Sequence, residues 1–412
     1  MNNKLYVLPL KWFLLFNVFT QLLFWLGPIR YNINNNASLL LFFVIVDVAF
    51  YLGYKRGMSR FKPSRYVLSK SAVRIIILLG LLSSIIGLTQ LWIEHGLTFS
   101  FSTLVNSLLD PGRAYNSESE SEMQTSYGAL LLTPFYWMSI PMGIYYWKRL
   151  PRLFKIIVVL IPIVSLIGWF GVGVRKGIID LFIILFFSFV AYKPQIVLEK
   201  KNKRKLLLAF FVFVVLFILY FLFSNLSRSS MSSYGELTDL VTGNYKEFYS
   251  SNLPMTVVAG LVMIQSYLCQ GYYALGLSLN WNIIHTAPMG MSWMTIAIAR
   301  KFGYDPLPNS YMHYLEKFDI DPSMNWHSIY VWLANDFTFI GVPIIIFLIG
   351  YFLAITWCDS LHKQNTLAFP IMNLFVVMCF YSFANNQVLS FSFIPFVFCG
   401  VVYYLSSHSK LG

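Results

Sequence analysis

Long apolar runs recur along the whole chain and constrain its fold more than any other feature. A run of about 20 apolar residues can cross the hydrocarbon core of a bilayer as a helix. Hydrophobic residues make up 57% of the 412 residues and charged residues 11%, a composition that excludes an ordinary soluble globular protein. We therefore expect an all-α, polytopic transmembrane helix bundle of about ten spans, at 10–28, 37–54, 73–93, 128–147, 156–173, 177–192, 206–223, 339–357, 367–384 and 388–405.

The basic residues indicate how these spans are oriented. Most of the 30 Lys and Arg residues fall in connections that lie on one side if the N-terminus is cytoplasmic. Connections rich in Lys and Arg stay in the cytoplasm, so we expect both termini there. The net charge of +13 then reflects topology. Since no aromatic-basic module accompanies it, we expect no nucleic-acid partner.

Two connections on the opposite side are long, and function in such a layout is expected on that side. The predicted division is an N-terminal bundle at 1–223, a large external loop at 224–338 and C-terminal spans at 339–412. Within the loop, the stretch 254–281 is uncharged and long enough to span. We expect it to lie in the membrane plane or to re-enter, whereas a full crossing would invert all that follows.

The connection FGVGVRKG breaks the charge rule, because Arg175 and Lys176 lie opposite most other cations. Charges beside the hydrocarbon region are costly and are therefore candidates for function. A snorkelling pair favoured by the C-terminal dipole of the preceding helix explains them equally well. Glycines at 171, 173 and 177 would let a bulky ligand approach. Fixed cations beside open backbone would suit a diphosphate.

Three more charged residues lie at or within predicted spans. Arg228 follows the seventh span and could bracket the same anionic headgroup as Arg175. Asp47 and Asp180 fall inside spans, where an unpaired carboxylate is costly. A structural ion pair and a proton pathway would each explain these two aspartates.

The segment HYLEKFDIDPSMNWHSIYVWLANDF gathers ionisable side chains before the eighth span. His327 and Asp336 stand closest to that span, and a histidine is a plausible proton acceptor near neutral pH, although an interfacial structural histidine is as common. The Asp319-Ile320-Asp321 pattern could hold a divalent cation, which we rank below a solvated loop. The segment also contains His313 and Glu316.

Three stretches resemble the Wzy-type polymerases that build O-antigen, capsule and exopolysaccharide from lipid-linked repeat units. GVGVRKGIIDLF (171–182) is similar to a turn of small residues and an arginine between two spans. SYLCQGYYALGLSLN (266–280) is similar to a polar-aromatic part of the large periplasmic loop. NWHSIYVWLANDFTFIGVPIIIFLIG (325–350) is similar to the segment where that loop returns to the membrane, with Thr338 where glycine is usual.

The resemblance implies a membrane fold of the GT-C glycosyltransferase type in a bacterial inner membrane, with the active site on the periplasmic side. The implied reaction moves a growing glycan from undecaprenyl diphosphate to a lipid-linked acceptor unit, without a metal or other cofactor. Membrane lipids, a chain-length regulator and a flippase of the same pathway are the other implied partners. The implied roles are catalysis by His327 and Asp336, diphosphate binding by Arg175, Lys176 and Arg228, and substrate binding by Gln270, Tyr272, Tyr273, Asn325 and Trp326.

Two other functions compete with polymerisation. An O-antigen ligase would use the same kind of donor and external cations but transfer the polymer to lipid A core. A flippase or transporter would also need charge within the membrane, yet such proteins usually show repeated halves and short external loops. The sequence shows neither feature.

Overall fold

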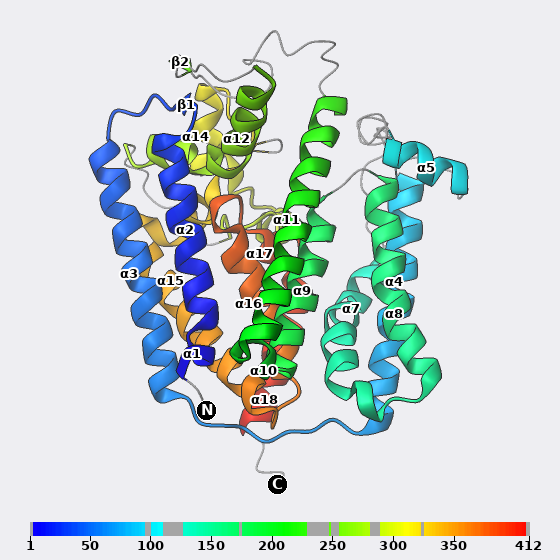
Figure 1. Cartoon of the computed structure of the whole chain (residues 1–412). Helices are drawn as coiled ribbons and strands as arrows, with labels where there is room; N and C mark the ends of the chain where they lie inside the picture. Colours follow the sequence, from blue (N-terminus) through cyan, green and yellow to red (C-terminus); the bar gives the residue numbers. More distant parts are fainter. Residues whose placement is uncertain are drawn as a thin grey trace. The chain divides into compact units, whose positions relative to one another are not determined.

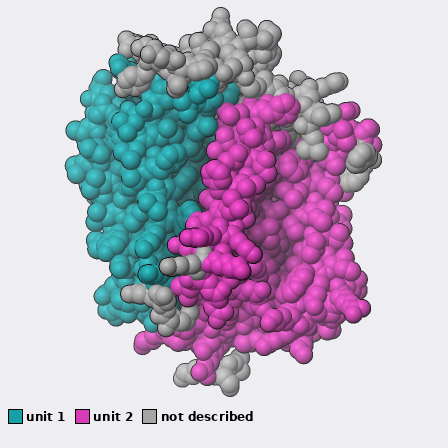
Figure 2. Space-filling model, viewed as in Figure 1, with its two compact units in different colours: residues 1–61, 233–355, 374–393 teal, residues 62–232, 356–373, 394–412 magenta. Residues whose placement is uncertain are grey.

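The structure is a computed structural model that describes residues 3–94, 100–109, 127–172, 175–228, 247–248, 255–280, 289–322 and 325–408. The chain divides into two compact units, which Figure 2 colours separately. The first unit comprises 1–61, 233–355 and 374–393, and the second comprises 62–232, 356–373 and 394–412. The division predicted at 223 and 338 concerns membrane topology and stays a prediction.

The fold is all-α, as predicted (Figure 1). In the described part of the chain, six helices are long and apolar enough to cross a membrane. They are α2 (Leu8–Leu26), α3 (Asn36–Arg60), α4 (Lys70–Glu94), α8 (Arg152–Gly171), α11 (Lys200–Arg228) and α15 (Ser328–His362). The other predicted spans coincide largely with α7 (Tyr127–Tyr146), α9 (Lys176–Tyr192), α16 (Ala368–Phe380) and α18 (Phe393–His408). The ten-span count itself stays a prediction.

The remaining elements connect or cover these helices. Helix α12 (Met255–Ser278) is continuous over most of the stretch 254–281, and its in-plane or re-entrant placement stays a prediction. A two-residue antiparallel pair joins β1 (Ile29–Arg30) to β2 (Glu247–Phe248). The others are α1 (Asn3–Tyr6), α5 (Phe101–Leu109), η1 (Trp147–Arg149), α10 (Gln195–Leu198), α13 (Trp293–Lys301), η3 (Leu307–Asn309), α14 (Tyr311–Leu315), η4 (Glu316–Phe318), η5 (Tyr381–Phe383) and α17 (Gln387–Phe391).

Helix α15 begins earlier than the span predicted at 339–357. It consists of two helical segments joined at Thr338, whose φ of 56° and ψ of 164° are non-helical. Such a conformation is close to glycine-only, so the threonine is strained there. The additional helical turns before Thr338 carry a run of buried side chains, Ile329 to Ala334. Burial within the unit therefore stabilises the first segment of α15, which is too short to be recognised in the sequence as a membrane-length apolar run.

Glycines bring α3 and α15 into backbone contact within the first unit. A Cβ at Gly53 would lie 2.0 Å from the carbonyl oxygen of Phe347, and one at Gly57 would lie 2.3 Å from that of Tyr351. From the other side, a Cβ at Gly350 would lie 2.6 Å from a carbonyl oxygen of α3. Gly53 and Gly57 form the small-xxx-small pattern that allows apolar helices to approach closely.

In the second unit, α4 packs against α7 and α8, and a buried carboxylate holds a connecting segment. Asp359, near the end of α15, accepts hydrogen bonds from the backbone N–H and the hydroxyl of Ser64, and from the Tyr403 hydroxyl at 3.1 Å. Asn365 donates to the hydroxyls of Ser64 and Ser406, both at 2.9 Å. These contacts fix the segment after α3 to the turn between α15 and α16.

We expect Gly53→Ala to destabilise the protein, because the added methyl group forces α3 and α15 apart at a backbone contact. The loss should be about 1–3 kcal/mol, measured as a lower midpoint of thermal unfolding in detergent. Gly87→Ala is the matched control, since Gly87 is also helical and a Cβ there meets nothing within 4 Å. That variant should gain up to about 1 kcal/mol from helix propensity. Equal midpoints for the two variants would contradict the close approach.

Candidate functional site

The cations predicted to bind a diphosphate lie at the start of α9. Arg175 is the N-cap residue and Lys176 the first residue of that helix, whereas α8 has already ended at Gly171. Arg175 is 4% exposed, and its guanidinium carbon lies 5.0 Å from the ring centre of Phe221 in α11. The positive end of a helix dipole disfavours cations and favours anions. The C-terminal dipole of α8 therefore does not account for their placement.

Lys176 forms an ion pair with Asp180, one turn further along α9. Asp180 is buried, so the pair supplies the compensation that a carboxylate in an apolar helix requires. Of the two explanations that the sequence left open for Asp180, the structure shows the ion pair. The ammonium of Lys176 thus already has an anionic partner within its own helix.

The glycines around this turn accommodate tryptophan rings of the same chain. A Cβ at Gly171 would lie 2.7 Å from Trp92 Nε1, and one at Gly177 would lie 2.1 Å from the Trp169 indole. The prediction that these two glycines leave room for a ligand is therefore wrong, because indole rings already take that space. Gly173 lies outside the described residues. Arg228 is the last residue of α11, and its side chain also lies outside the description.

The residues predicted to bind substrate and to catalyse belong to the first unit, and four of them lie together. Gln270 of α12 accepts a hydrogen bond through Oε1 from the backbone N–H of Trp326 at 3.1 Å. The next N–H, of His327, donates to Asn385 Oδ1 at 2.8 Å. Asn325 accepts through Oδ1 from the N–H of Asp321 at 2.7 Å. The structure thus brings together four residues to which the resemblance gave roles, and it adds Asn385, which the sequence analysis missed.

Gly271 allows these elements to meet. A Cβ on Gly271 would lie 2.1 Å from the carbonyl oxygen of Phe383 and 2.6 Å from the backbone nitrogen of Ser328. Helix α12, the start of α15 and the 3-10 turn η5 therefore touch at their backbones. Because the contact leaves no room for a methyl group, glycine is required here for steric reasons.

His327 is fully buried, with 0% exposure. Its Nδ1 lies 2.9 Å from the carbonyl oxygen of Asn325, and since a carbonyl only accepts, the neutral ring carries its proton on Nδ1 and a lone pair on Nε2. Burial lowers the pKa of His327 to about 4, while the carbonyls of Asn325 and Ile320 and the Asp321 carboxylate oppose the shift. The imidazole is therefore neutral near pH 7 and a weaker base than usual.

Asp336 holds a backbone segment. Its Oδ1 accepts from the N–H of Gly290 at 2.7 Å and its Oδ2 from the N–H of Met289 at 3.0 Å. The neighbouring Asn335 donates to the carbonyl oxygen of Gly290 at 3.1 Å. The described contacts of His327 do not include Asp336, and nine residues of helix separate the two by roughly 13 Å. Direct support of His327 by Asp336 thus finds no contact in this structure.

Two predicted substrate residues belong to the core of the first unit. Tyr272 is 0% exposed and its hydroxyl lies 2.9 Å from Thr20 Oγ1 in α2. Tyr273 is 2% exposed, with its ring centre 5.4 Å from that of Tyr31. Neither ring presents a face to solvent in this conformation, so their predicted contact with sugar requires a rearrangement.

Asp47 is held by two amides from α2. Asn17 Nδ2 donates to Asp47 Oδ1 at 2.8 Å, and Gln21 Nε2 donates to Oδ2 at 3.0 Å. Ser382 in turn donates to Asn17 Oδ1 at 3.0 Å. Asn17 and Gln21 are two polar residues of the first predicted span, one helical turn apart. That spacing was a signal in the sequence that two polar side chains share one helix face.

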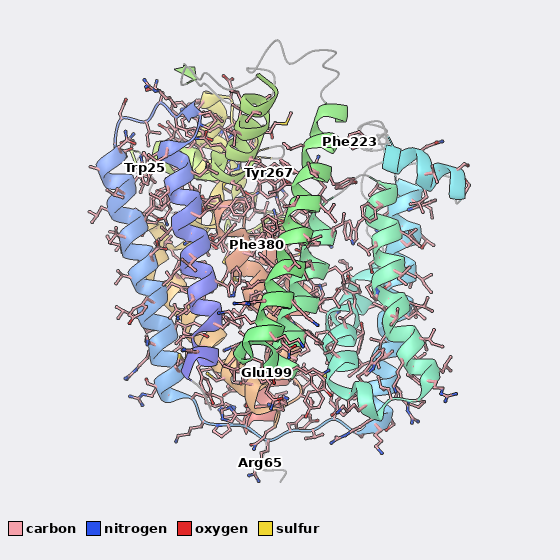
Figure 3. The ribbon with its side chains drawn as sticks, in the orientation of Figure 1. Trp25, Arg65, Glu199, Phe223, Tyr267 and Phe380 are labelled. Atoms are coloured by element: carbon pink, nitrogen blue, oxygen red, sulfur yellow. The ribbon has the colours of Figure 1, made fainter. Side chains whose placement is uncertain are left out.

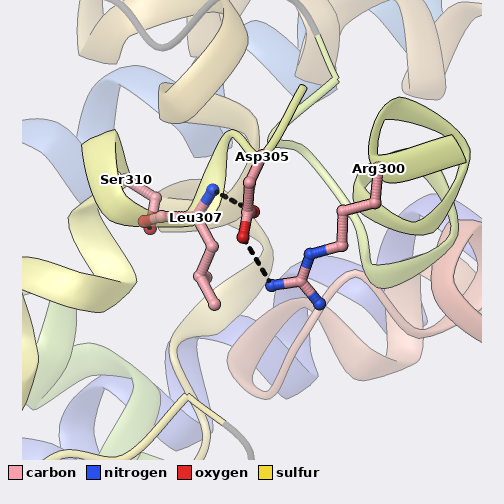
Figure 4. A network of polar contacts seen from close by, with 4 residues as sticks. All are labelled: Arg300, Asp305, Leu307 and Ser310. Carbon is pink, nitrogen blue, oxygen red and sulfur yellow. Dashed lines mark hydrogen bonds and ion pairs between the residues drawn. The ribbon is translucent and has the colours of Figure 1, made fainter. Parts of the chain in front are cut away.

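Two other acidic residues before α15 have local partners. Asp305 accepts from Arg300 Nη2 at 3.0 Å and from the Leu307 N–H at 3.1 Å (Figure 4). The hydrogen bond from Arg300 lowers the pKa of Asp305. Glu316 pairs with His313 at 3.2 Å. Among the described residues, no group of three or more His, Cys, Asp and Glu side chains is placed to hold a metal ion.

No family model, curated protein or solved structure matches the chain.

The burial of His327 makes stability depend on pH. Unfolded, the imidazole takes up a proton below its ordinary pKa of 6.5, whereas folded it stays neutral down to about pH 4. The unfolded state then binds more protons between these values, so the free energy of unfolding falls as the pH is lowered from about 6.5 to about 4. The full loss is on the order of 3 kcal/mol. Thermal unfolding in detergent at pH 7.5 and 4.5 measures it.

His327→Gln should remove most of this pH dependence, because glutamine has no proton to gain in that range. His313→Gln is the control, since His313 is an exposed histidine of the same segment. A steep acid loss that persists in His327→Gln would show that another group is responsible.

Proposed function

We propose that the chain is a membrane glycosyltransferase that polymerises undecaprenyl-diphosphate-linked oligosaccharide units into a surface polysaccharide. The observation that carries the proposal is the placement of Arg175 and Lys176 at the positive end of α9, beside apolar helices. An anion at this position would interact favourably with the helix dipole and with the guanidinium. The resemblance to the Wzy-type family supplies the identity of that anion.

On this proposal Arg175 binds the diphosphate, with Lys176 and Arg228 as further contacts. The acceptor hydroxyl oxygen bonds to the anomeric carbon of the donor glycan, and the bond from that carbon to the diphosphate oxygen breaks. The diphosphate leaves with the bonding electrons and gains negative charge. A fixed cation stabilises this change more than it stabilises the starting state, which is the requirement for catalysis.

The hydroxyl proton needs an acceptor, and His327 is the proposed one. Because its ring is fully buried in this conformation, this role requires the same kind of rearrangement as contact of Tyr272 and Tyr273 with sugar. The tautomer supports this role, since Nε2 carries a lone pair. A base with a pKa of about 4 stays unprotonated over a wide range, so the acid limb of the rate profile should lie near pH 4 and not near 6.5. If His327 is not the base, His313, Asp319 and Asp321 are the alternatives. Asp336 would act indirectly, through the 289–290 backbone.

The proposed setting is a bacterial inner membrane, with both termini in the cytoplasm and the site on the periplasmic side. Six membrane-length apolar helices support a membrane location. Membrane lipids surround the bundle on this proposal. The flippase that delivers lipid-linked units and the regulator that limits chain length would be its functional partners.

The products that accumulate when the gene is deleted test the proposed function. We expect single lipid-linked repeat units without polymer, restored to polymer by the wild-type gene. Full-length polymer that is not attached to lipid A core would instead identify a ligase. An unchanged set of lipid-linked products would contradict glycosyl transfer altogether.

Arg175→Ala should abolish polymer formation in the complemented strain, because the substitution removes a charge-assisted contact with the departing diphosphate. A loss of at least about 10²-fold is expected for such a contact. Arg152→Ala is the matched control, since Arg152 begins the preceding helix and is exposed, and that variant should form normal polymer. Both variants should reach wild-type levels in the membrane. Normal polymer from Arg175→Ala would return Arg175 to a snorkelling role.

A further inference from the structure

Two partly exposed aromatic rings meet beside the cluster around His327. Tyr267 lies on α12, where Figure 3 labels it, and Trp326 lies just before α15. Their ring centres are 5.2 Å apart with an interplanar angle of 69°. Both side chains are intermediate in exposure, in contrast to the buried Tyr272 and Tyr273.

The backbone around Trp326 is fixed on both sides. Its own N–H donates to Gln270, and the N–H of the following residue donates to Asn385. The preceding residue, Asn325, donates its N–H to the carbonyl oxygen of Asp321 at 2.8 Å and accepts from the N–H of Asp321 through Oδ1. The ring of Phe383 lies 6.4 Å from that of Trp326. The indole is therefore held in place before any ligand arrives, which lowers the entropic cost of binding.

A rigid aromatic surface with polar neighbours suits a ligand that has one apolar face and a polar edge. Tryptophan and tyrosine offer a large contact area at low conformational cost and combine an apolar body with a polar group. A pyranose ring has this character, because its axial C–H groups form an apolar face and its hydroxyls lie at the rim. Trp326 has polar neighbours in the chain, because its backbone N–H bonds to the amide of Gln270 and the residue before it bonds to the exposed Asp321.

We propose that Trp326 and Tyr267 form the platform on which a sugar ring of the lipid-linked glycan stacks. This inference rests on the proposed function and assigns glycan recognition to this pair in place of Tyr272 and Tyr273. The competing explanation is an interfacial anchor, since Trp and Tyr are common at membrane–water interfaces. An anchor and a sugar platform differ in what they bind, and that difference is measurable.

The test compares two ligands on the purified protein in nanodiscs. The first is the lipid-linked oligosaccharide extracted from the deletion strain, and the second is undecaprenyl diphosphate, which has no sugar. Trp326→Ala should weaken binding of the first by about tenfold, the loss expected for one stacked ring, and leave the second unchanged. Trp326→Phe should keep most of the affinity. Tyr267→Ala should lose affinity for the first ligand only.

Trp25→Ala is the control, because Trp25 is a partly exposed tryptophan of the same unit, at the end of α2 (Figure 3). It should bind both ligands as the wild type does. Equal weakening toward both ligands in Trp326→Ala, or wild-type binding of the glycan-bearing lipid, would overturn the platform.

Polymer formation separates this failure from failure of the proposed function. In membranes supplied with rising amounts of the lipid-linked unit, Trp326→Ala should raise the apparent KM and lower kcat much less. If the wild type polymerises while Trp326→Ala shows no change in KM, the platform is wrong and the function stands. If the wild type forms no polymer from that unit, the function fails, and the platform fails with it.

Discussion

An apolar surrounding supplies no hydrogen bonds, so every polar group within these helices must find its partner inside the protein. Asp47 shows how this constraint shapes the first unit. Its carboxylate recruits Asn17 and Gln21 from α2, and Asn17 in turn recruits Ser382 from the turn after α16. One carboxylate therefore fixes the alignment of α2, α3 and the turn η5. Packing of apolar side chains alone would allow these segments to slide past one another at little cost in free energy.

The same constraint explains some of the charged side chains by their partners within the chain. Asp180 has Lys176 as its counter-ion, and Asp359 has three donors, so folding accounts for both carboxylates. Arg175 lies against the ring of Phe221, and its backbone starts a helix whose dipole favours an anion. His327 is fully buried, and the carbonyl of Asn325 accepts its Nδ1 proton, which leaves the lone pair on Nε2.

The fold class followed from the sequence because a membrane-length apolar run has few alternatives. Helix α15 was only partly predictable: its second segment is such a run, whereas its first depends on burial against neighbours that the sequence does not name. Gln270, Asn325, Trp326 and His327 were singled out through the resemblance, not as a cluster. Their hydrogen bonds were not predictable, since Asn385 lies about 60 residues away and bonds to His327 only in the folded chain. The prediction that the glycines beside Arg175 leave room for a ligand was wrong, because a glycine makes room for a tryptophan ring as readily as for a ligand.

The hydrogen bonds of Asp336 restrict which side chains can replace it. Both of its oxygens accept from backbone N–H groups, so the position requires two hydrogen-bond acceptors. A side chain of similar volume does not suffice. Asparagine has nearly the same volume, yet its amide N–H would face one of these backbone N–H groups. Two donors cannot form a hydrogen bond with each other. Glutamate keeps both acceptors but places them a bond length further from the 289–290 backbone. The position thus distinguishes between side chains that are interchangeable on most helix surfaces.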